Sequence, residues 1–147
     1  AVSSGTSALT VALASAGVGF GDEVIMPTFT FVASFESILS IGAIPVLCDI
    51  DDTLTLNPQA VEKAITSKTK VVMPVHLTGR PARMPEILEI ANKYNLFVLE
   101  DAAQAVGARL NDKRVGSWGD AACFSLHPLK NSNPFPTVAC LCLSFLD

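Results

Sequence analysis

The segment CFSLHPLKN, residues 123–131, places a lysine directly after a largely apolar run. An amine at the edge of an apolar pocket loses hydration and gives up its proton more readily. The neutral amine is a nucleophile that forms a Schiff base with a carbonyl compound. Lys130 is therefore a candidate catalytic residue. The alternative is a lysine that ends a strand and points to water, which is the commoner role of a single lysine. The apolar side chains that indicate burial are those of Cys123, Phe124, Leu126 and Leu129.

A second feature is the segment SSGTSAL, residues 3–9, at the start of a predicted helix. Gly5, Thr6 and Ser7 lie where the helix has free N–H groups, and these groups and the helix dipole favour an anion such as phosphate. Serine and threonine in this position are also ordinary helix caps. The motif alone leaves both interpretations open.

A third feature is the segment LEDAAQ, residues 99–104, at the end of a predicted strand. A carboxylate in that place needs a partner, because an unpaired buried charge is costly. Asp101 can pair with a protonated ring nitrogen, or it can cap the residues that follow. Further along the chain, Ser125 and His127 alternate with an apolar residue, so both face one side of a regular strand.

Together these features supply an anion cradle, a carboxylate and a desolvated lysine. In open α/β sheets, positions where strands end carry the ligand sites. Pyridoxal 5′-phosphate needs donors for its phosphate, an acid for its ring nitrogen and an amine for its aldehyde. The set therefore makes this cofactor a good candidate.

Composition limits the other possibilities. The chain has 147 residues, of which 50% are hydrophobic and 16% charged, and its net charge is −4. This indicates one domain with a buried parallel sheet. No basic stripe indicates nucleic-acid binding, and no apolar run or leader indicates a membrane span or a signal peptide. The cysteine spacing matches no zinc pattern, so we expect no metal site and free thiols in a reducing cytoplasm. The four cysteines are Cys48, Cys123, Cys140 and Cys142.

The order of elements predicts an α/β fold with a mostly parallel sheet flanked by helices. Strands are predicted at residues 22–27, 44–50, 70–77, 96–101 and 121–128. Helices are predicted at residues 3–17, 31–42 and 84–94, and from Pro58, with Asn57 as a cap. The third of these helices should turn Ile87, Leu88, Ala91 and Tyr94 inward. Residues 112–120 are polar and glycine-rich, which predicts a turn or short hairpin.

The last segment, residues 131–147, differs from the rest of the chain. It contains no lysine, arginine or glycine, and Asp147 carries its only charge. Residues 138–146 form an apolar run that could be one buried strand. We therefore divide the chain at residue 131, with an atypical tail at residues 132–147.

The chain resembles the pyridoxal-phosphate-dependent sugar aminotransferases of the DegT type, which share the aspartate-aminotransferase fold (fold type I). The resemblance extends over residues 1–131 and implies a partial large cofactor-binding domain. The motifs that carry it, in order along the chain, are SSGTSAL, GDEVIMPTFTFVAS, GAIPVLCDID, VVMPVHLTGRPA, VLEDAAQAVGA and GSWGDAACFSLHPLKN.

The resemblance also implies roles for single residues. Lys130 matches the lysine that holds the cofactor, and Asp101 matches the acid on the pyridine nitrogen. His127 matches a histidine that supports the groups around the cofactor, whereas His76 matches a position that is more often structural. The other matched cofactor-binding positions are Gly5, Thr6 and Ser7 with Ser125 at the phosphate, Phe31 on the ring and Gln104 near the 3-hydroxyl.

The implied reaction moves an amino group from an amino acid, commonly glutamate, to a keto-sugar carried on a nucleotide, for cell-surface polysaccharide or related amino-sugar synthesis. Family members form homodimers and are more than twice as long as this chain. They continue with a glycine-rich segment after the lysine, so a fragment or frameshift is one hypothesis for the tail. We expect weak cofactor binding and no turnover from the 147-residue chain.

Two alternatives stay open. One is a sugar dehydratase of the same superfamily, in which a histidine replaces the lysine, so that Lys130 argues against it. The other is an inactive remnant or a regulatory binding protein with the same fold.

Overall fold

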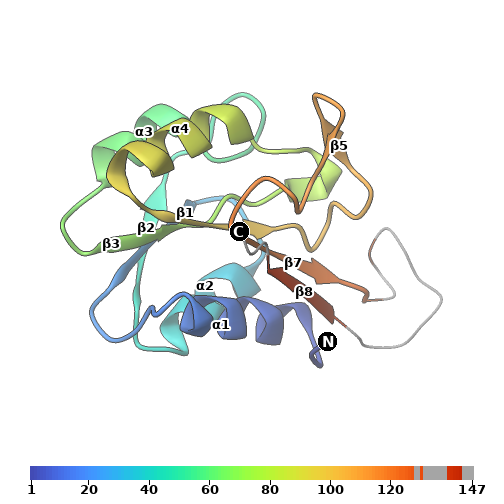
Figure 1. Cartoon of the computed structure of the whole chain (residues 1–147), viewed down its shortest axis with the longest axis horizontal. Helices are drawn as coiled ribbons and strands as arrows, with labels where there is room; N and C mark the ends of the chain where they lie inside the picture. The colour runs from blue at the N-terminus through green and yellow to red at the C-terminus, as the bar shows by residue number, and fades with distance from the viewer. Residues whose placement is uncertain (128–129, 131–138, 144–147) are drawn as a thin grey trace.

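A mostly parallel sheet forms the centre of this computed structural model, which describes residues 1–127, residue 130 and the strand at residues 139–143 (Figure 1). Within the described residues the main sheet has six strands in the order β2-β1-β3-β4-β7-β8. The first five are parallel neighbours, and β8 runs antiparallel to β7. The strands are β1 (Glu23–Pro27), β2 (Ile44–Cys48), β3 (Thr69–Val72), β4 (Phe97–Asp101), β7 (Ala121–Ser125) and β8 (Ala139–Leu143).

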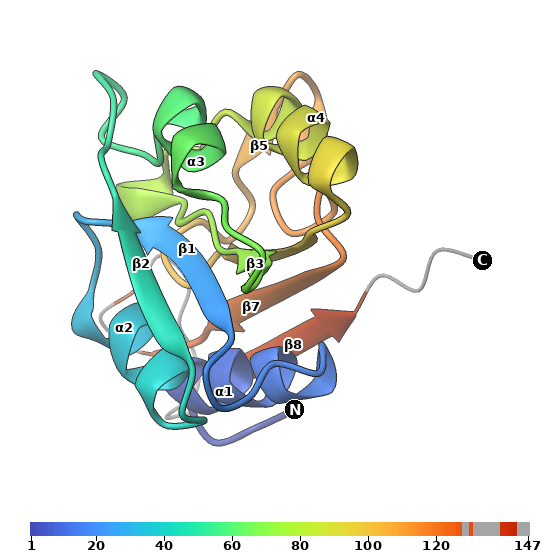
Figure 2. The ribbon, with the colours of Figure 1, turned by 90° about the vertical axis from the view of Figure 1, so that its left-hand side faces the viewer.

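Helices cover both faces of the sheet, and most residues of its central strands are accordingly apolar (Figure 1). Figure 2 shows α1 and α2 on one side of the sheet and α3 and α4 on the other. The fold class predicted from the sequence is therefore confirmed. The helices are α1 (Gly5–Ser15), α2 (Val32–Leu39), α3 (Pro58–Ala64) and α4 (Met84–Tyr94), with a short 3-10 turn, η1 (Leu77–Gly79).

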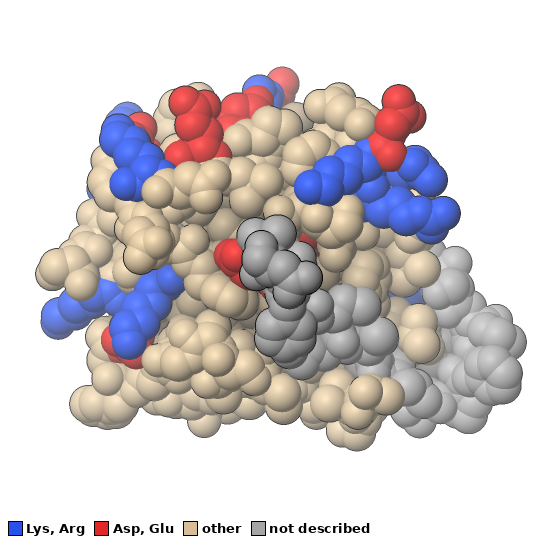
Figure 3. Space-filling view, in the orientation of Figure 1, with Lys and Arg blue, Asp and Glu red and all other residues tan. Residues whose placement is uncertain are grey.

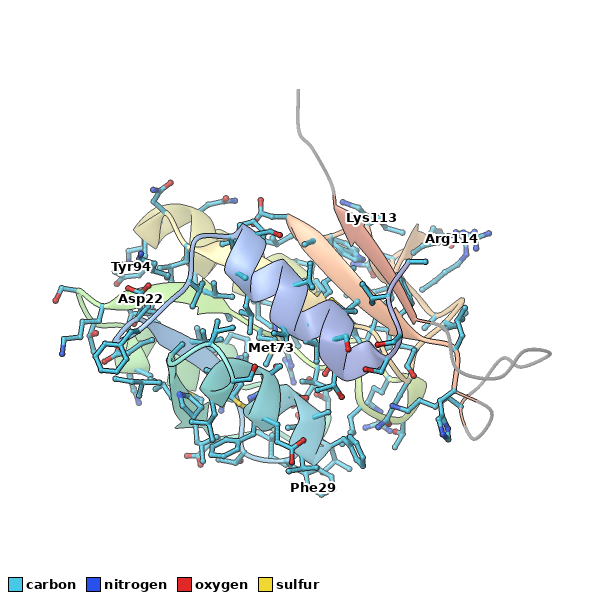
Figure 4. All side chains as sticks on the ribbon, turned by 90° about the horizontal axis from the view of Figure 1, so that it is seen from below. Asp22, Phe29, Met73, Tyr94, Lys113 and Arg114 are labelled. Atoms are coloured by element: carbon cyan, nitrogen blue, oxygen red, sulfur yellow. The ribbon has the colours of Figure 1, made fainter. Side chains whose placement is uncertain are left out.

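Strand residues alternate between two hydrophobic cores, because successive side chains of a strand point to opposite faces. Met26 and Leu99 belong to the core beneath α1 and α2, whereas Ile25 and Val98 belong to the core beneath α3 and α4. Met73, which Figure 4 labels beside α1 and α2, belongs to the core beneath these two helices. This alternation decides which side chain at a strand end faces which side.

Helix boundaries follow from local capping. Ser4 caps α1 by accepting a hydrogen bond from the Ser7 N–H, and Asn57 caps α3, which begins at Pro58. Helix α4 ends at Asn95, whose left-handed backbone (φ 54°) stops it without a glycine. The predicted start of α3 and the predicted bounds of α4 are confirmed.

Several predicted elements are too long. The strand predicted at residues 121–128 ends at Ser125. The strand predicted at residues 70–77 ends at Val72, since Pro74 has no N–H with which to extend the ladder. The strand predicted to reach residue 50 ends at Cys48, and Ile50 turns away to form an isolated antiparallel bridge with Leu56. The helix predicted at residues 31–42 occupies only Val32–Leu39.

The prediction that Tyr94 points inward is wrong. Its side chain is 40% exposed, and its hydroxyl donates a 3.3 Å hydrogen bond to the Glu62 carboxylate on α3. A phenol at the end of a helix keeps its polar tip in water, which the apolar periodicity of α4 does not reveal. The predicted inward positions Ile87 and Ala91 are buried, and Leu88 is partly buried against the same core.

The polar segment after β4 forms a small hairpin, as the sequence predicts, from β5 (Arg109–Leu110) and β6 (Lys113–Arg114). In the tail, the backbone of β8 confirms a strand within residues 138–146. Its predicted burial, and the side chains of Leu129, Cys140 and Cys142, lie outside the described residues. Among the described residues, no helix is long and apolar enough to cross a membrane.

Candidate active site

The ends of two strands and the start of one helix meet at a cavity of about 350 Å³. Strand β4 ends at Asp101, β7 ends at Ser125, and α1 begins beside them at Gly5. This volume is within the range of small-ligand sites, and its position matches the ligand site of open α/β sheets. Eight of the nine residues predicted for the site line it: Gly5, Thr6, Phe31, Asp101, Gln104, Ser125, His127 and Lys130.

Strand alternation places Asp101 and Ser125 on the same side of the sheet. Asp101 follows Leu99 by two residues and Ser125 follows Cys123 by two, and both apolar residues belong to the core beneath α1. The two polar side chains therefore continue the α1 face of the sheet beyond its core. His127 lies past the end of β7 and also lines the cavity.

Asp101 is almost fully buried, and both of its carboxylate oxygens are held. Oδ1 accepts a 3.1 Å hydrogen bond from the Ala103 N–H, and Oδ2 accepts a 2.8 Å hydrogen bond from the Ser34 hydroxyl. Oδ1 thus binds the backbone that follows, but residues 102–108 form turns and not a helix, so Asp101 is not the helix cap of the alternative prediction. A carboxylate has about four acceptor positions. Asp101 can therefore hold its own loop and still accept a proton donor from the cavity.

Gln104 reaches the cavity from the turn after β4. Its Oε1 accepts a 2.9 Å hydrogen bond from the Thr78 N–H. Thr78 adopts a left-handed backbone (φ 54°) inside η1, which turns this N–H toward Gln104. The side-chain oxygen is therefore occupied by the protein, and the amide NH₂ group is the donor that Gln104 has for a ligand.

The start of α1 packs directly on the end of β7. A Cβ atom added to Gly5 would lie 3.2 Å from the Cβ of Ser125, so glycine permits this close approach. Thr6 and Ser125 consequently line one cavity. Ser7 is not among the lining residues; its hydroxyl lies 2.9 Å from that of Ser4 and 3.2 Å from that of Ser3. The structure therefore brings Ser4, rather than Ser7, to the cavity wall.

Lys130 extends into the same cavity beside Phe31. Its Nζ lies 5.4 Å from the centre of the Phe31 ring, within the range of a cation–π contact. Its backbone N–H donates a 2.9 Å hydrogen bond to the His127 carbonyl. Lys130 therefore lines the cavity, rather than ending a strand and pointing into open solvent.

Two hydroxyl residues of the cavity, Thr30 and Ser34, are missing from the sequence-based set. They lie around the start of α2, on either side of Phe31. Ser34 is four residues from Thr30 and three from Phe31. This helical spacing could have placed Ser34 on the same side of the helix as both. No rule based on residue type would have selected them, because hydroxyls at a helix start are usually caps.

The neighbouring carboxylate, Glu100, faces the opposite side of the sheet and serves the fold. It is fully buried. Its oxygens accept hydrogen bonds from backbone N–H groups in the loop before β7 and from the His76 ring. The four donors are Gly116 N (2.8 Å), Trp118 N (2.7 Å), Gly119 N (2.8 Å) and His76 Nε2 (3.0 Å).

The tautomer of His76 follows from its partners. Its Nδ1 accepts a 3.0 Å hydrogen bond from the Ala82 N–H, so the proton of the ring is on Nε2, which donates to Glu100. His76 is fully buried and does not line the cavity. It connects the loop after β3 to the end of β4.

Burial alone raises the pKa of the Glu100 carboxyl. The hydrogen bonds from the His76 ring and from two glycine N–H groups outweigh burial, so the pKa of Glu100 lies below its ordinary value. Glu100 is therefore a carboxylate at neutral pH that ties two segments, the loop before β7 and the loop with His76, to the end of β4.

Comparison with known proteins agrees with this geometry. Residues 1–133 match the model of the DegT/DnrJ/EryC1/StrS aminotransferase family, and the chain belongs to that family. The family resemblance stated from the sequence is confirmed. Members of the family are pyridoxal-phosphate-dependent, and several of the relatives found are named as transaminases of nucleotide sugars.

One curated relative is the UDP-N-acetyl-3-dehydro-alpha-D-glucosamine 3-aminotransferase of Acidithiobacillus ferrooxidans. It is 52% identical over 129 residues, which are 87% of this chain and 35% of the relative. The chain thus spans about a third of the length of the curated relatives it matches.

Two solved structures have the same fold. The Streptomyces venezuelae DesV structure in complex with a ketimine intermediate has a TM-score of 0.93 at 44% identity, and covers 97% of this chain and 38% of DesV. The Bacillus subtilis NtdA structure with bound cofactor PMP has a TM-score of 0.90 at 39% identity, and covers 96% of this chain and 32% of NtdA. Over the part that it covers, the chain has the fold of these aminotransferases.

The described residues fit pyridoxal phosphate. The cavity has an oriented buried carboxylate on one wall, a lysine amine on another, and hydroxyls beside the N-terminus of α1. The close approach of Gly5 to Ser125 draws helix N–H groups and hydroxyls to one end of the cavity, which is suitable for a phosphate. The lining as a whole is apolar with a few placed polar groups, as in cofactor sites generally.

We predict that Glu100→Gln destabilises the fold without removing a cavity group. The amide NH₂ would face donors that now bind a carboxylate oxygen, so the free energy of unfolding at pH 7 should fall by roughly 3 kcal/mol. Because folding lowers the pKa of Glu100, its contribution is present above the unfolded pKa of roughly 4.3 and is lost as the pH falls through the folded value.

Urea unfolding followed by circular dichroism, from pH 7 down to pH 3, measures both effects. The stability difference between wild type and Glu100→Gln should shrink toward the acid end. Glu89→Gln, on the exposed side of α4, is the matched control and should change stability by less than about 0.5 kcal/mol. A difference that stays constant over this range would contradict the role of the Glu100 charge.

Proposed function

We propose that this chain belongs to a pyridoxal-phosphate-dependent enzyme that moves an amino group from an amino acid, glutamate, to a keto-sugar carried on a nucleotide. The proposed role is cell-surface polysaccharide or related amino-sugar synthesis. The observation that carries the proposal is the meeting of Asp101, Lys130 and the α1 hydroxyls at one cavity. Family membership supports the reaction class, and the sugar-nucleotide relatives support the substrate class.

Lys130 is the proposed catalytic residue. When bound, pyridoxal phosphate supplies an aldehyde and a ring that withdraws electrons from the reacting carbon. The Lys130 amine would be the nucleophile for this aldehyde, and the amine freed by the amino donor would carry a proton between the two carbons that flank the transferred nitrogen. Lys130 is half-buried beside Phe31, and this position limits the access of water to the amine.

Asp101 is the proposed partner of the ring nitrogen. Its carboxylate would accept a hydrogen bond from the protonated nitrogen and so keep the proton on that nitrogen. A protonated ring nitrogen is what makes the ring an electron sink. The fixed positions of both oxygens mean that little reorientation is needed when the ring arrives.

The remaining roles concern binding. Thr6 and Ser125 are proposed to donate to the phosphate together with N–H groups at the start of α1. Phe31 is proposed to lie on one face of the ring, and the Gln104 amide to donate near the 3-hydroxyl. His127 is proposed to support these groups from the end of β7. Ser7 and Gly5 act through the backbone of the helix start, since the Ser7 hydroxyl is held by its serine neighbours.

We propose that the working unit is a homodimer in the cytoplasm. Three apolar side chains at the start of α2 are about half exposed, namely those of Phe29, Phe31 and Val32, and Phe31 also lines the cavity. Figure 4 shows Phe29 projecting outward beside α2. On the face that Figure 3 shows, charged side chains lie mainly on the α3 and α4 side of the molecule. Exposed apolar side chains that lie together favour a protein partner. Cys48 is a thiol that donates to the Ala60 carbonyl, which suits a reducing compartment.

The dehydratase alternative requires a histidine at the lysine position, and Lys130 at the cavity argues against it. A remnant or regulatory protein with the same fold is distinguished by whether Lys130 reacts with the cofactor.

We predict that pyridoxal phosphate binds covalently to Lys130. Incubation of the full chain with the cofactor, reduction with borohydride and peptide mass spectrometry should locate one phosphopyridoxyl group on Lys130. Lys130→Ala should remove this adduct while leaving weaker, non-covalent binding through the phosphate cradle. Lys113→Ala, which removes an amine far from the cavity, is the control and should leave the adduct in place.

Modification of another lysine at a similar yield, or of no residue, would contradict the proposed function. Retention of the adduct in Lys130→Ala would contradict the assignment of the nucleophile.

We further predict self-association through the apolar surface at Phe29. Wild type should sediment as a dimer at micromolar concentration, and Phe29→Glu should shift the chain toward the monomer because a carboxylate cannot be buried there without a partner. Phe20→Glu is the matched control, since Phe20 is also exposed but lies before β1, whereas Phe29 lies after its other end. A wild-type monomer, or equal effects of the two substitutions, would contradict this interface.

A further inference from the structure

We propose that Ser34, with Thr30 behind it, is a positioning residue for the proposed cofactor acid Asp101. The inference rests on the proposed function and deepens it. A chain of three side chains runs along one wall of the cavity, with 3.0 Å between the Thr30 and Ser34 hydroxyl oxygens and 2.8 Å between Ser34 Oγ and Asp101 Oδ2.

The direction of these hydrogen bonds follows from donor and acceptor capacity. A carboxylate only accepts, so the single Ser34 hydrogen is donated to Asp101. Between the two hydroxyls, the remaining donor is that of Thr30, which therefore donates to Ser34. The order is Thr30 to Ser34 to Asp101, and every step delivers a hydrogen bond toward the carboxylate.

Ser34 is well placed to orient the carboxylate because its own position is fixed. It is almost fully buried in the first turn of α2. Its N–H donates to the Phe31 carbonyl at 3.1 Å, and its carbonyl accepts from the Ser37 hydroxyl at 2.8 Å. A donor held at both ends of its backbone has few other positions available, and a hydrogen bond to a charged acceptor is stronger than one between neutral groups.

Ser34 and Ala103 hold different oxygens of Asp101, and they come from different segments of the chain. The Ala103 N–H fixes Oδ1 from the loop after β4, and Ser34 fixes Oδ2 from α2. Without Ser34, Asp101 would keep one backbone contact and could rotate about it. The hydroxyl therefore sets the plane in which the carboxylate meets a ring nitrogen.

The same helix start also carries Phe31, the proposed ring-stacking residue. The first turn of α2 thus supplies both the surface for the ring face and the donor that orients the acid at the ring edge. Changes at Ser34 should consequently affect ligands according to whether their ring has a nitrogen.

The test compares two ligands in the full chain. Pyridoxal 5′-phosphate has the ring nitrogen, and 1-deazapyridoxal 5′-phosphate has a C–H group in its place. Dissociation constants are measured by absorbance or fluorescence titration for wild type and variants. Wild type should prefer pyridoxal phosphate, and Ser34→Ala should reduce this preference by about tenfold, as expected for a lost hydrogen bond to a charged group.

Matched variants separate orientation from general damage to the fold. Ser34→Thr keeps the hydroxyl and should keep the preference. Thr30→Val removes the second hydrogen bond and should lower the preference by about threefold. Ser40→Ala makes the same chemical change at the end of α2, outside the cavity, where the hydroxyl donates to the Ser37 carbonyl, and should weaken both ligands equally or not at all.

A purely structural role for Ser34 would make Ser34→Ala bind both ligands more weakly by the same factor, and that result would overturn the inference. Equal loss of preference in Ser34→Thr and Ser34→Ala would also overturn it. The borohydride adduct on Lys130 distinguishes failure of this inference from failure of the proposed function. If wild type forms the adduct but Ser34→Ala leaves the ligand preference unchanged, this inference alone is contradicted. If wild type forms no adduct, the proposed function is contradicted, and this inference with it.

Discussion

Two adjacent carboxylates at the end of β4 point to opposite faces of one sheet, and the arrangement of the site depends on this alternation. Glu100 accepts four hydrogen bonds beneath α4 and ties the loop before β7 and the His76 loop to the strand end. Asp101 faces the α1 and α2 side, where its oxygens are held by Ser34 and Ala103. One residue secures the strand end, and the next presents a charge to the cavity.

The fold brings the other groups to Asp101 through the geometry of parallel strands. Strands β4 and β7 are neighbours that end at the same edge, so Ser125 and the segment that carries Lys130 arrive beside Asp101. Helix α1 reaches this edge because Gly5 lets its first turn approach Ser125. The apolar cores beneath the two helix pairs fix these elements, and the chemistry is confined to the edge where the cores end.

Much of this arrangement can be predicted from local patterns. The alternation of strands and helices predicts the parallel sheet, and strand ends predict Asp101 and Ser125. The sequence did not indicate Ser34, because its partner is 67 positions away and a hydroxyl in a first helical turn has an ordinary local explanation. The environment of Glu100 is equally non-local, since its donors come from loops that approach only after folding. Tyr94 was wrongly predicted to point inward, because the apolar periodicity of α4 carries no information about the hydroxyl of its phenol ring.

The central claim is that Asp101 keeps a proton on the ring nitrogen of pyridoxal phosphate held by Lys130. Nitrogen-15 NMR of the full chain with ring-labelled cofactor tests it most directly. In wild type the chemical shift and the one-bond coupling to hydrogen should be those of a protonated pyridine nitrogen. In Asp101→Asn the cofactor should still be attached to Lys130, but the signal should move to the unprotonated position. An unprotonated nitrogen in wild type, or an unchanged signal in Asp101→Asn, would contradict the account.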